Sequence, residues 1–321
     1  MKLTANFLLL PISNINVEEL LAFENKNTAE EIKKTILTTG IKSFHVANEK
    51  SLSNFVLKGL SKIETNNQSL FQNIDAIIVV SQTFDSRIPN LSTKIQKSLR
   101  LPHSTYCLDL FDGCTGYIKA ISIVDMLHQK GLSRVLVVAG DLNSSITEKA
   151  ETSTKILFGD GVSFSIFEKS DTRAKSLIFN DGDSEGVISC QVNEGIMKMN
   201  GFEVFRFTRN VVPKLIKNFL LRESIEIDSY DFIGMHQASK LVVSSLCSSL
   251  GIKNKYTENF NCESVGNLGA GSIGAWVANI CNIENCVSKK ILLVGYGAGL
   301  SWGLVSLSVQ LKKNKIIYVD C

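Results

Sequence analysis

The stretch Leu110-Phe111-Asp112-Gly113-Cys114-Thr115-Gly116-Tyr117 joins an apolar, strand-like run to a long helical pattern. It places Cys114 at the N-terminus of a helix, where the macrodipole is positive and several N–H groups have no intrahelical partner. Both features favour the thiolate, which is the nucleophilic form of cysteine. The flanking glycines, Gly113 and Gly116, leave room for another segment or a ligand to approach. Taken alone, the pattern also fits a small buried core residue, since free cysteine is often buried.

The same order of elements occurs twice along the chain. In each half a helical pattern precedes a buried strand that runs into a polar loop, at 75–83 and at 231–239. A second helix, an extended segment and a glycine-flanked turn come next, and a longer helix then leads to an apolar strand that ends in glycine. Cys114 and Asn267 occupy the two equivalent turns. The helices predicted before and after the two buried strands cover 51–63, 91–99, 204–221 and 240–250.

The spacings agree between the two halves. Asp75 precedes Cys114 by 39 positions, and Asp231 precedes Asn267 by 36 positions. The distances from these turns to the strand-ending glycines are 26 and 28 positions. An internal duplication of this kind fixes the architecture before any single motif does.

We therefore predict an α/β protein with two similar halves, residues 1–170 and residues 171–321, and a boundary near 168–175. Continuous apolar strands that alternate with helices predict sheets that are covered on both faces. The first half carries Cys114, and the second half carries His236 and Asn267.

Equivalent positions of two packed halves meet near their pseudo-twofold axis, so we expect Cys114 and Asn267 to lie close together. His236 follows the second-half strand at its carboxyl end, where α/β folds place their ligands. A thiol, an imidazole and a carboxamide are thus predicted to converge. Asn267 also suits a helix N-cap, which does not exclude a donor role. Most lone histidines are structural, but none of the other three, at 45, 103 and 128, has a comparable context.

Two glycine-rich segments adjoin apolar strands. The segment 295–303, Gly-Tyr-Gly-Ala-Gly-Leu-Ser-Trp-Gly, lacks the G-x-G-x-x-G spacing and a following helix, so a dinucleotide site is not predicted. It reads as a hairpin turn with close backbone approach, whose N–H groups are candidates for an oxyanion hole. We interpret Phe158-Gly159-Asp160-Gly161 as a second hairpin turn with a structural role.

Composition excludes several classes of function. The 321 residues are 44% hydrophobic and 20% charged with a net charge of +3, which suits a globular protein with two cores. Basic residues form no stripe interleaved with aromatic ones, so no nucleic-acid role is predicted. Lysines at 312, 313 and 315 are expected in a solvated turn before a last strand at 316–319. No run of about 18 apolar residues predicts a membrane span, and the apolar run after Met1 reads as a first strand and not as a signal peptide.

The eight cysteines predict free thiols. They form no CxxC pair, and a disulfide framework belongs to short secreted chains. Cys281 and Cys286 are five positions apart without a nearby histidine, so no metal site is predicted. Cys247 and Cys281 fall in helical patterns and are expected to be buried. We predict a cytoplasmic protein without cofactor or metal.

Together, Cys114, His236 and Asn267 resemble the catalytic residues of the ketoacyl-acyl carrier protein synthase III family, condensing enzymes with the thiolase fold. The resemblance runs from about residue 30 to the C-terminus. It implies two duplicated halves in a layered αβαβα arrangement, and a homodimer. Elongating synthases carry a second histidine in place of the asparagine, and degradative thiolases carry a second cysteine in the C-terminal glycine turn. The resemblance rests on the order and spacing of Thr39-Gly40-Ile41, the Cys114 turn, 158–161, His236-Gln237-Ala238, Gly266-Asn267 and 297–303.

The resemblance implies a reaction in two stages. Cys114 takes an acyl group from a thioester, and the N–H groups of Cys114 and Ala298 bind the oxyanion. His236 and Asn267 then donate hydrogen bonds to a malonyl thioester, whose loss of carbon dioxide gives the enolate that attacks the acyl-enzyme. The β-ketoacyl product belongs to fatty acid or polyketide-like biosynthesis. Ile88 aligns with the residue that gates the acyl pocket of the neighbouring subunit.

The chain departs from the family where the family binds coenzyme A. Lys34, Thr38 and Thr152 stand at positions of a tryptophan and two arginines. Leu241, beside Lys240, stands at the arginine that docks the carrier protein. Acyl and malonyl thioesters on acyl carrier protein or coenzyme A are the implied substrates, and these changes favour a carrier-bound or unusual acyl donor.

Two other functions remain open from the sequence. The same scaffold could transfer the acyl group from Cys114 to an oxygen or nitrogen nucleophile. The chain could also be a non-catalytic partner in a condensing heterodimer, although such subunits tend to lose the nucleophile. Asp112 replaces an alanine of the family and would oppose thiolate formation if it faced the sulfur, so we predict that it points away.

Overall fold

The computed structural model describes residues 1–24, 27–67, 69–252, 262–280 and 289–320. None of the helices in these ranges is long and apolar enough to cross a membrane. The helices are α1 (Val17–Phe23), α2 (Ala29–Thr39), α3 (Leu52–Asn66), α4 (Leu91–Ser98), α5 (Gly116–Gln129), α6 (Ser144–Thr147), α7 (Thr152–Lys155), α8 (Gly201–Glu223), α9 (Lys240–Leu250) and α10 (Ser272–Ile280). The strands are β1 (Lys2–Pro11), β2 (Asn14–Asn16), β3 (Ser43–His45), β4 (Ala76–Ser81), β5 (Tyr106–Phe111), β6 (Arg134–Leu142), β7 (Asp160–Glu168), β8 (Lys175–Asn180), β9 (Ile188–Cys190), β10 (Met197–Met199), β11 (Phe232–Met235), β12 (Lys289–Gly297) and β13 (Ser301–Val319).

The strand order repeats between the halves. First-half strands lie in the order β5-β4-β6-β7-β1, and the second half gives β11-β12-β13-β8. In the first half β4 is parallel to β6, and β7 is antiparallel to both β6 and β1. In the second half β11 is parallel to β12, and β13 is antiparallel to both β12 and β8. The duplication predicted from sequence spacing is therefore present in the topology.

One long strand belongs to both halves. The first part of β13 pairs with β12 and β8, and its last part pairs in parallel with β1. Main-chain hydrogen bonds run along its length, so the boundary predicted near residue 170 is bridged by a shared sheet. The division into two domains stays a prediction.

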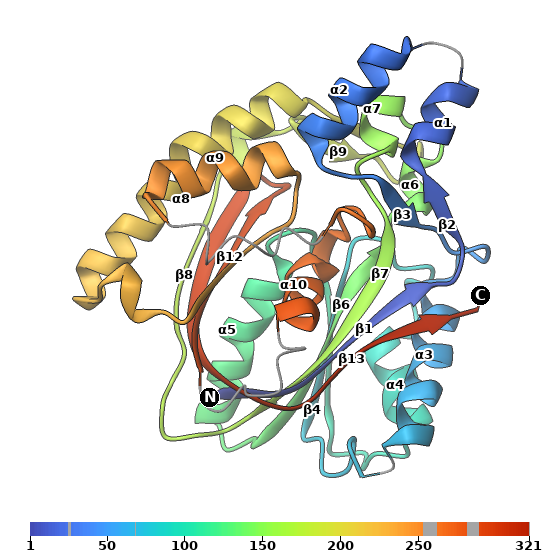
Figure 1. The fold of residues 1–321 in the computed structure, drawn as a ribbon. Coiled ribbons are helices and arrows are strands. Elements are labelled where there is room, and N and C mark those ends of the chain that lie inside the picture. The colour runs from blue at the N-terminus through green and yellow to red at the C-terminus, as the bar shows by residue number, and fades with distance from the viewer. Residues whose placement is uncertain (25–26, 68, 253–261, 281–288, 321) are drawn as a thin grey trace.

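Helices cover both faces of each half, as Figure 1 shows. α3 and α4 lie outside the first-half strands, and α8 and α9 lie outside the second-half strands. α5 and α10 lie between the two sets of strands. This is the αβαβα layering that the family resemblance implied, and it agrees with the prediction of sheets covered on both faces.

Neighbouring strand residues enter different cores. In β4, Ile78 faces the central core with α5, whereas Val79 faces the outer core with α3. In β12, Leu293 faces the central core and Val294 faces α8 and α9. A period of two with apolar residues on both faces is what a sheet between helices requires.

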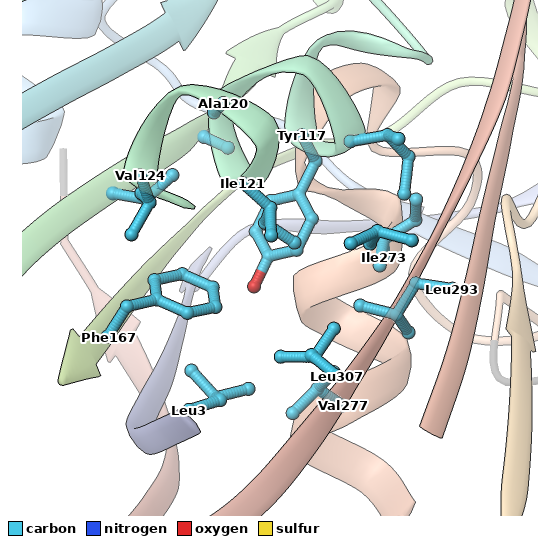
Figure 2. Close-up of a cluster of buried hydrophobic side chains, with 14 of the residues drawn as sticks. Leu3, Tyr117, Ala120, Ile121, Val124, Phe167, Ile273, Val277, Leu293 and Leu307 are labelled. Carbon is cyan, nitrogen blue, oxygen red and sulfur yellow. The ribbon is translucent and has the colours of Figure 1, made fainter. Parts of the chain in front are cut away.

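The central core fixes the two helices that come after the Cys114 and Asn267 turns. Figure 2 shows Tyr117 and Ile121 of α5 beside Ile273 and Val277 of α10. These side chains are at most 1% exposed, and each contributes about 1.5–3 kcal/mol relative to an exposed one. The Tyr117 hydroxyl is hydrogen bonded to Ser165 Oγ at 2.8 Å, so its polar end is also satisfied.

The lysine-rich segment near the C-terminus is not a turn, and that prediction is wrong. Lys313 and Lys315 lie within β13, opposite Ala5 and Phe7 of β1. Pairing with β1 extends the strand without a break, because the backbone can stay in a sheet while the lysine side chains reach water.

Five cysteines of the described residues are free thiols: Cys107, Cys114, Cys190, Cys247 and Cys262. Cys247 is buried as predicted. Cys281, for which burial was expected, and Cys286 and Cys321 lie outside the described residues, as does most of the extended segment expected before Asn267.

Candidate active site

A cavity of about 190 Å³ is lined by residues of both halves, and Cys114, His236 and Asn267 are all among them. The three residues singled out from the sequence therefore share one cavity. No Lys, Arg, Asp or Glu of the described residues lines it. The rest of the lining is mostly apolar: Leu157, Phe158, Ile188, Met197, Met199, Val204, Leu241, Val242 and Tyr296, with Thr38, Thr39, Gln82, Ala238, Ser239, Gly201, Gly297 and Ala298.

The turn between β12 and β13 lies directly against the nucleophile. A Cβ atom on Gly297 would lie 2.6 Å from Cys114 Cβ and 2.8 Å from Cys114 Sγ. Thr115 Oγ1 donates to the carbonyl of Ser301 at 3.1 Å, and Ser301 Oγ donates to Thr115 Oγ1 at 2.8 Å. Gly297 pairs with Ser301 across the turn, so the predicted hairpin with close backbone approach is confirmed.

The Cys114 thiol is held in its protonated form in the protein alone. Burial, followed by the negative charge of Asp141, raises its pKa to about 12. Hydrogen bonds from the N–H groups of Ala298 and of Cys114 itself act in the opposite direction. Burial of the sulfur thus opposes the expectation that the helix N-terminus would favour the thiolate, because a buried charge loses its hydration.

Asp112 is bound by a lysine of the helix that comes after it. Lys119 Nζ lies 2.6 Å from Asp112 Oδ2. The charge of Asp112 still adds to the raised pKa of the Cys114 thiol, after burial and Asp141. The carboxylate is thus engaged by Lys119 and also acts on the sulfur.

His236 is a neutral, buried imidazole. It is 1% exposed, and burial lowers its pKa to about 3. Its backbone N–H donates to Val294 at 2.8 Å, and the Tyr296 hydroxyl donates to its carbonyl at 2.6 Å. Nδ1 is buried and has no hydrogen-bond partner among the residues that the structure describes. At neutral pH the ring therefore carries one N–H, which suits a hydrogen-bond donor better than a strong base.

Asn267 is held with its amide oxygen inside its own turn. Oδ1 accepts hydrogen bonds from the N–H of Gly269 and from Ser272 Oγ, both at 3.0 Å. The two donors identify which end of the amide is the oxygen, so the NH₂ group is the end left for a further contact. Asn267 is among the residues that line the cavity. A carboxamide held in this way presents a neutral donor at any pH.

The segment 158–161 supports the Asn267 turn. Phe158 and Asn267 form an isolated parallel bridge, and Gly159 donates to the Asn267 carbonyl at 3.1 Å. A Cβ atom on Gly159 would lie 2.1 Å from the Val265 carbonyl oxygen. The predicted hairpin turn is wrong, because the two short helices α6 and α7 separate β6 from β7. The segment does serve the structure, by close contact with the second half.

Sequence analysis missed two polar residues at this site. Gln82, which comes directly after β4, lines the cavity, and Asp141, near the end of β6, binds the Gln82 backbone N–H at 2.7 Å. Both lie where parallel strands end, and that position was the signal that could have identified them.

Ala298 and Ile88 are the remaining predicted site residues. Ala298 lines the cavity and its N–H binds the Cys114 sulfur. Ile88 is 84% exposed and is not among the residues that line the cavity of this chain. Its role at the acyl pocket of a neighbouring subunit stays a prediction.

Comparisons with known proteins point in one direction. The profile of 3-oxoacyl-[acyl-carrier-protein (ACP)] synthase III matches residues 108–186, and the profile of its C-terminal part matches residues 220–309. The β-ketoacyl-[acyl-carrier-protein] synthase III of Acholeplasma laidlawii is 31% identical over 278 residues, which cover 84% of this chain and 87% of that protein. The corresponding protein of Lactococcus lactis subsp. cremoris is 27% identical over 293 residues, with 84% and 89% covered.

Solved structures agree with this likeness. The 3-oxoacyl-(acyl-carrier protein) synthase of Burkholderia xenovorans superposes with a TM-score of 0.88 at 25% identity, over 99% of this chain and 97% of that one. The priming β-ketosynthase of the R1128 polyketide pathway has a TM-score of 0.84 at 21% identity, over 96% of each chain, and shows a common fold.

Proposed function

The chain belongs to the 3-oxoacyl-[acyl-carrier-protein] synthase III family and has its thiolase-like fold, and on this premise we propose that Cys114, His236 and Asn267 carry the condensation. The activity is acyl transfer to a cysteine followed by decarboxylative condensation with a malonyl thioester. The observation that supports these residue roles is their shared cavity, with a thiol from the first half facing neutral donors from the second.

In the first stage the acyl group moves from the sulfur of its donor to the sulfur of Cys114. The sulfur attacks the thioester carbonyl, the thiol proton is released, and the departing carrier thiol takes up a proton, so the exchange is proton-neutral. The oxyanion of the tetrahedral intermediate accepts hydrogen bonds from the N–H groups of Cys114 and Ala298. The hydrogen bond from the Ala298 N–H to the Cys114 sulfur supports this role.

In the second stage the malonyl thioester loses carbon dioxide. Its thioester carbonyl accepts hydrogen bonds from the imidazole N–H of His236 and the NH₂ group of Asn267, and these bonds strengthen as the enolate forms. The enolate carbon attacks the acyl-Cys114 carbonyl, the carbon–sulfur bond breaks, and the sulfur leaves and regains a proton. Decarboxylation supplies the carbanion, so no general base has to remove a proton from carbon.

We propose a carrier-bound acyl donor in preference to coenzyme A. The nucleotide phosphates of coenzyme A are bound best by cations, and no Lys or Arg of the described residues lines the cavity. Thr152, at the position of a family arginine, donates to the carboxylate of Glu24 at 2.5 Å. An acid therefore lies beside the position where the family has a cation. Acylation of Cys114 should show a higher kcat/KM from carrier protein than from coenzyme A carrying the same acyl group.

We also propose a homodimer joined along β5. This strand lies at the end of the sheet, and among the described strands it pairs with β4 alone. Phe111, the last residue of β5, is 74% exposed, and Ile88, which follows β4 in the sequence, is 84% exposed. An open edge with apolar side chains favours pairing with a second copy. Phe111→Lys should shift the sedimentation of the protein from dimer to monomer. A cytoplasmic setting, which keeps the thiols reduced, completes the proposal.

Intact-mass analysis tests the function directly. The protein is exposed to a panel of acyl thioesters on carrier protein and on coenzyme A, and then to malonyl-carrier protein, while carbon dioxide is measured. We expect one acyl adduct, which is absent in Cys114→Ala and retained in the exposed-thiol control Cys190→Ser. An ester or amide product formed without release of carbon dioxide would show that the reaction is acyl transfer to oxygen or nitrogen and not condensation. Absence of any acyl-enzyme would favour a non-catalytic subunit.

A further inference from the structure

Asp141 is a fully buried carboxylate that joins separate segments of the site. It lies near the end of β6 and is 0% exposed. Its Oδ1 accepts from Ser81 Oγ at 2.7 Å, from the Gln82 N–H at 2.7 Å and from Thr83 Oγ1 at 3.3 Å. Its Oδ2 accepts from the N–H of Ala270 at 2.9 Å. One side chain thus connects β6, the loop after β4 and the turn after Asn267.

The Oδ2 contact bears on the orientation of Asn267. A Cβ atom on Gly269 would lie 2.2 Å from Asp141 Oδ2, so the carboxylate lies directly against this glycine. The N–H of Gly269 is one of the two donors that hold the Asn267 amide oxygen. Asn143, two residues after Asp141, donates from Nδ2 to the Asn267 carbonyl at 3.3 Å. The Asn267 turn is therefore braced from β6.

The Oδ1 contacts lead toward the nucleophile. Gln82, whose N–H binds Asp141, lies against the residue that precedes Cys114: a Cβ atom on Gly113 would lie 2.6 Å from Gln82 Oε1. The charge of Asp141 also contributes more than that of Asp112 to the raised pKa of the Cys114 thiol. Asp141 therefore has contact with one catalytic turn and acts on the other.

The hydrogen-bonding pattern requires a carboxylate. The four partners of Asp141 are all donors, and they use both of its oxygens. An asparagine could accept at one end only, and its NH₂ group would then face another donor. Burial raises the pKa of Asp141 to about 6, and the hydrogen bonds from its four donors act in the opposite direction by stabilising the carboxylate.

We propose that Asp141 is a positioning residue of the condensation, which fixes the turn that presents the Asn267 amide to the malonyl thioester. This inference rests on the proposed function. Loss of Asp141 should therefore slow decarboxylation and not acyl transfer. Decarboxylation depends on the Asn267 turn, whereas acyl transfer depends on Cys114 and the 297–303 turn.

Asp141→Asn tests the inference. We expect carbon dioxide release from malonyl-carrier protein to fall at least tenfold, while acylation of Cys114 stays within twofold of the wild type or becomes faster. The pH profile of Cys114 alkylation by iodoacetamide should shift to lower pH, because a negative charge that opposes the thiolate is removed. The other charged or titratable groups near the sulfur are unchanged in this variant: Asp112 with its partner Lys119, the neutral His236, and Tyr296.

Asp125→Asn is the matched control. Asp125 is also buried, and it accepts hydrogen bonds from Gln129, Arg173 and Ala174 and not from the Asn267 turn. Its variant should slow both stages alike and leave the alkylation profile in place. If Asp141→Asn does not fold, Ser81→Ala takes its place, because it removes one donor to Asp141. Carbon dioxide release should then fall severalfold, while acylation of Cys114 stays within twofold of the wild type.

Equal slowing of both stages, or no change in either, would overturn the proposal. A wild-type protein that releases no carbon dioxide would overturn the proposed function instead. In that case an alkylation profile unmoved in Asp141→Asn overturns the role of Asp141, and a profile that moves to lower pH supports its link to the nucleophile.

Discussion

The Cys114 turn and the Asn267 turn occupy equivalent places in the duplicated fold, but they differ in their distance from the next helix. α5 begins two residues after Cys114, whereas α10 begins five residues after Asn267, with the 3₁₀ turn Gly269–Gly271 between. The additional residues supply the N–H of Gly269 and the hydroxyl of Ser272 that hold the Asn267 amide. A short turn leaves a sulfur available for reaction, and a longer one fixes an amide as a donor.

The residues directly after Gly140 in β6 and Gly295 in β12 show the same contrast. Asp141 follows Gly140 and binds the Gln82 N–H after β4, whereas Tyr296 follows Gly295 and binds the His236 carbonyl after β11. Each therefore connects its strand to the loop beyond the neighbouring parallel strand, with a carboxylate in the first half and a phenol in the second. The first half combines a thiol with a negative charge, and the second half provides neutral donors. The proposed mechanism thus divides covalent chemistry and polarisation of the malonyl thioester between the halves.

Removal of the nucleophile should give the largest effect. Cys114→Ala is expected to abolish the acyl-enzyme and the β-ketoacyl product, because Cys114 is the one cysteine among the described residues that line the cavity. Carbon dioxide release from malonyl-carrier protein should persist, since the second-half donors are intact. Intact mass measures the acyl-enzyme, and released carbon dioxide measures decarboxylation. Loss of both the acyl-enzyme and the carbon dioxide would show that the division between the halves is wrong.

Asn267→Asp should have the converse effect. The new carboxylate can still accept from Gly269 and Ser272, but it places an oxygen where the NH₂ group donated. Removal of one such donor costs about 10²–10³-fold in rate, and a negative charge facing the enolate adds to this. Carbon dioxide release should fall by about that factor, while acylation of Cys114 stays within severalfold. His236→Ala is the companion variant, and slowing confined to acylation would contradict the assignment.

The pH dependence of alkylation should distinguish Cys114 from an ordinary thiol. The pKa of Cys114 is raised to about 12, so its thiolate fraction should rise about tenfold per pH unit from pH 7 to pH 10. An unperturbed thiol levels off above about pH 8.5. Iodoacetamide labelling followed by mass spectrometry at Cys114 measures the profile. A plateau below pH 8 would show that the first half favours the thiolate after all.

Gly297→Ala should give the smallest of these effects. The new Cβ would lie 2.8 Å from the Cys114 sulfur, so the turn or the cysteine has to shift. Overpacking of this kind costs about 1–3 kcal/mol of stability, and acylation should slow about tenfold as the Ala298 N–H moves. Gly182→Ala is the control, because a Cβ there meets nothing within 4 Å. Thermal unfolding and the acylation rate are the measurements, and equal behaviour of both variants would contradict the close approach.

Much of this fold could be predicted because burial leaves a periodic record in the sequence. The alternation that puts Ile78 and Val79 into different cores comes from strand geometry, which is local. The spacings from Asp75 and Asp231 to their turns are also local features of the chain, and they indicated the duplication. The predictions that failed, the lysine turn and the 158–161 hairpin, concerned segments whose hydrogen-bond partners are distant. The lysine-rich segment pairs with β1, and the segment 158–161 pairs with Asn267.

The sequence by itself determined which residues meet, because a repeated order of strands and helices brings Cys114, His236 and Asn267 to the same end of the sheet. Only the tertiary structure decided their chemical state. Burial raises the pKa of the Cys114 thiol and lowers that of the His236 imidazole. Asp141 joins two turns that are more than a hundred residues apart in the chain. Desolvation and Coulomb energies depend on what surrounds a group in space, and the local sequence does not contain that information.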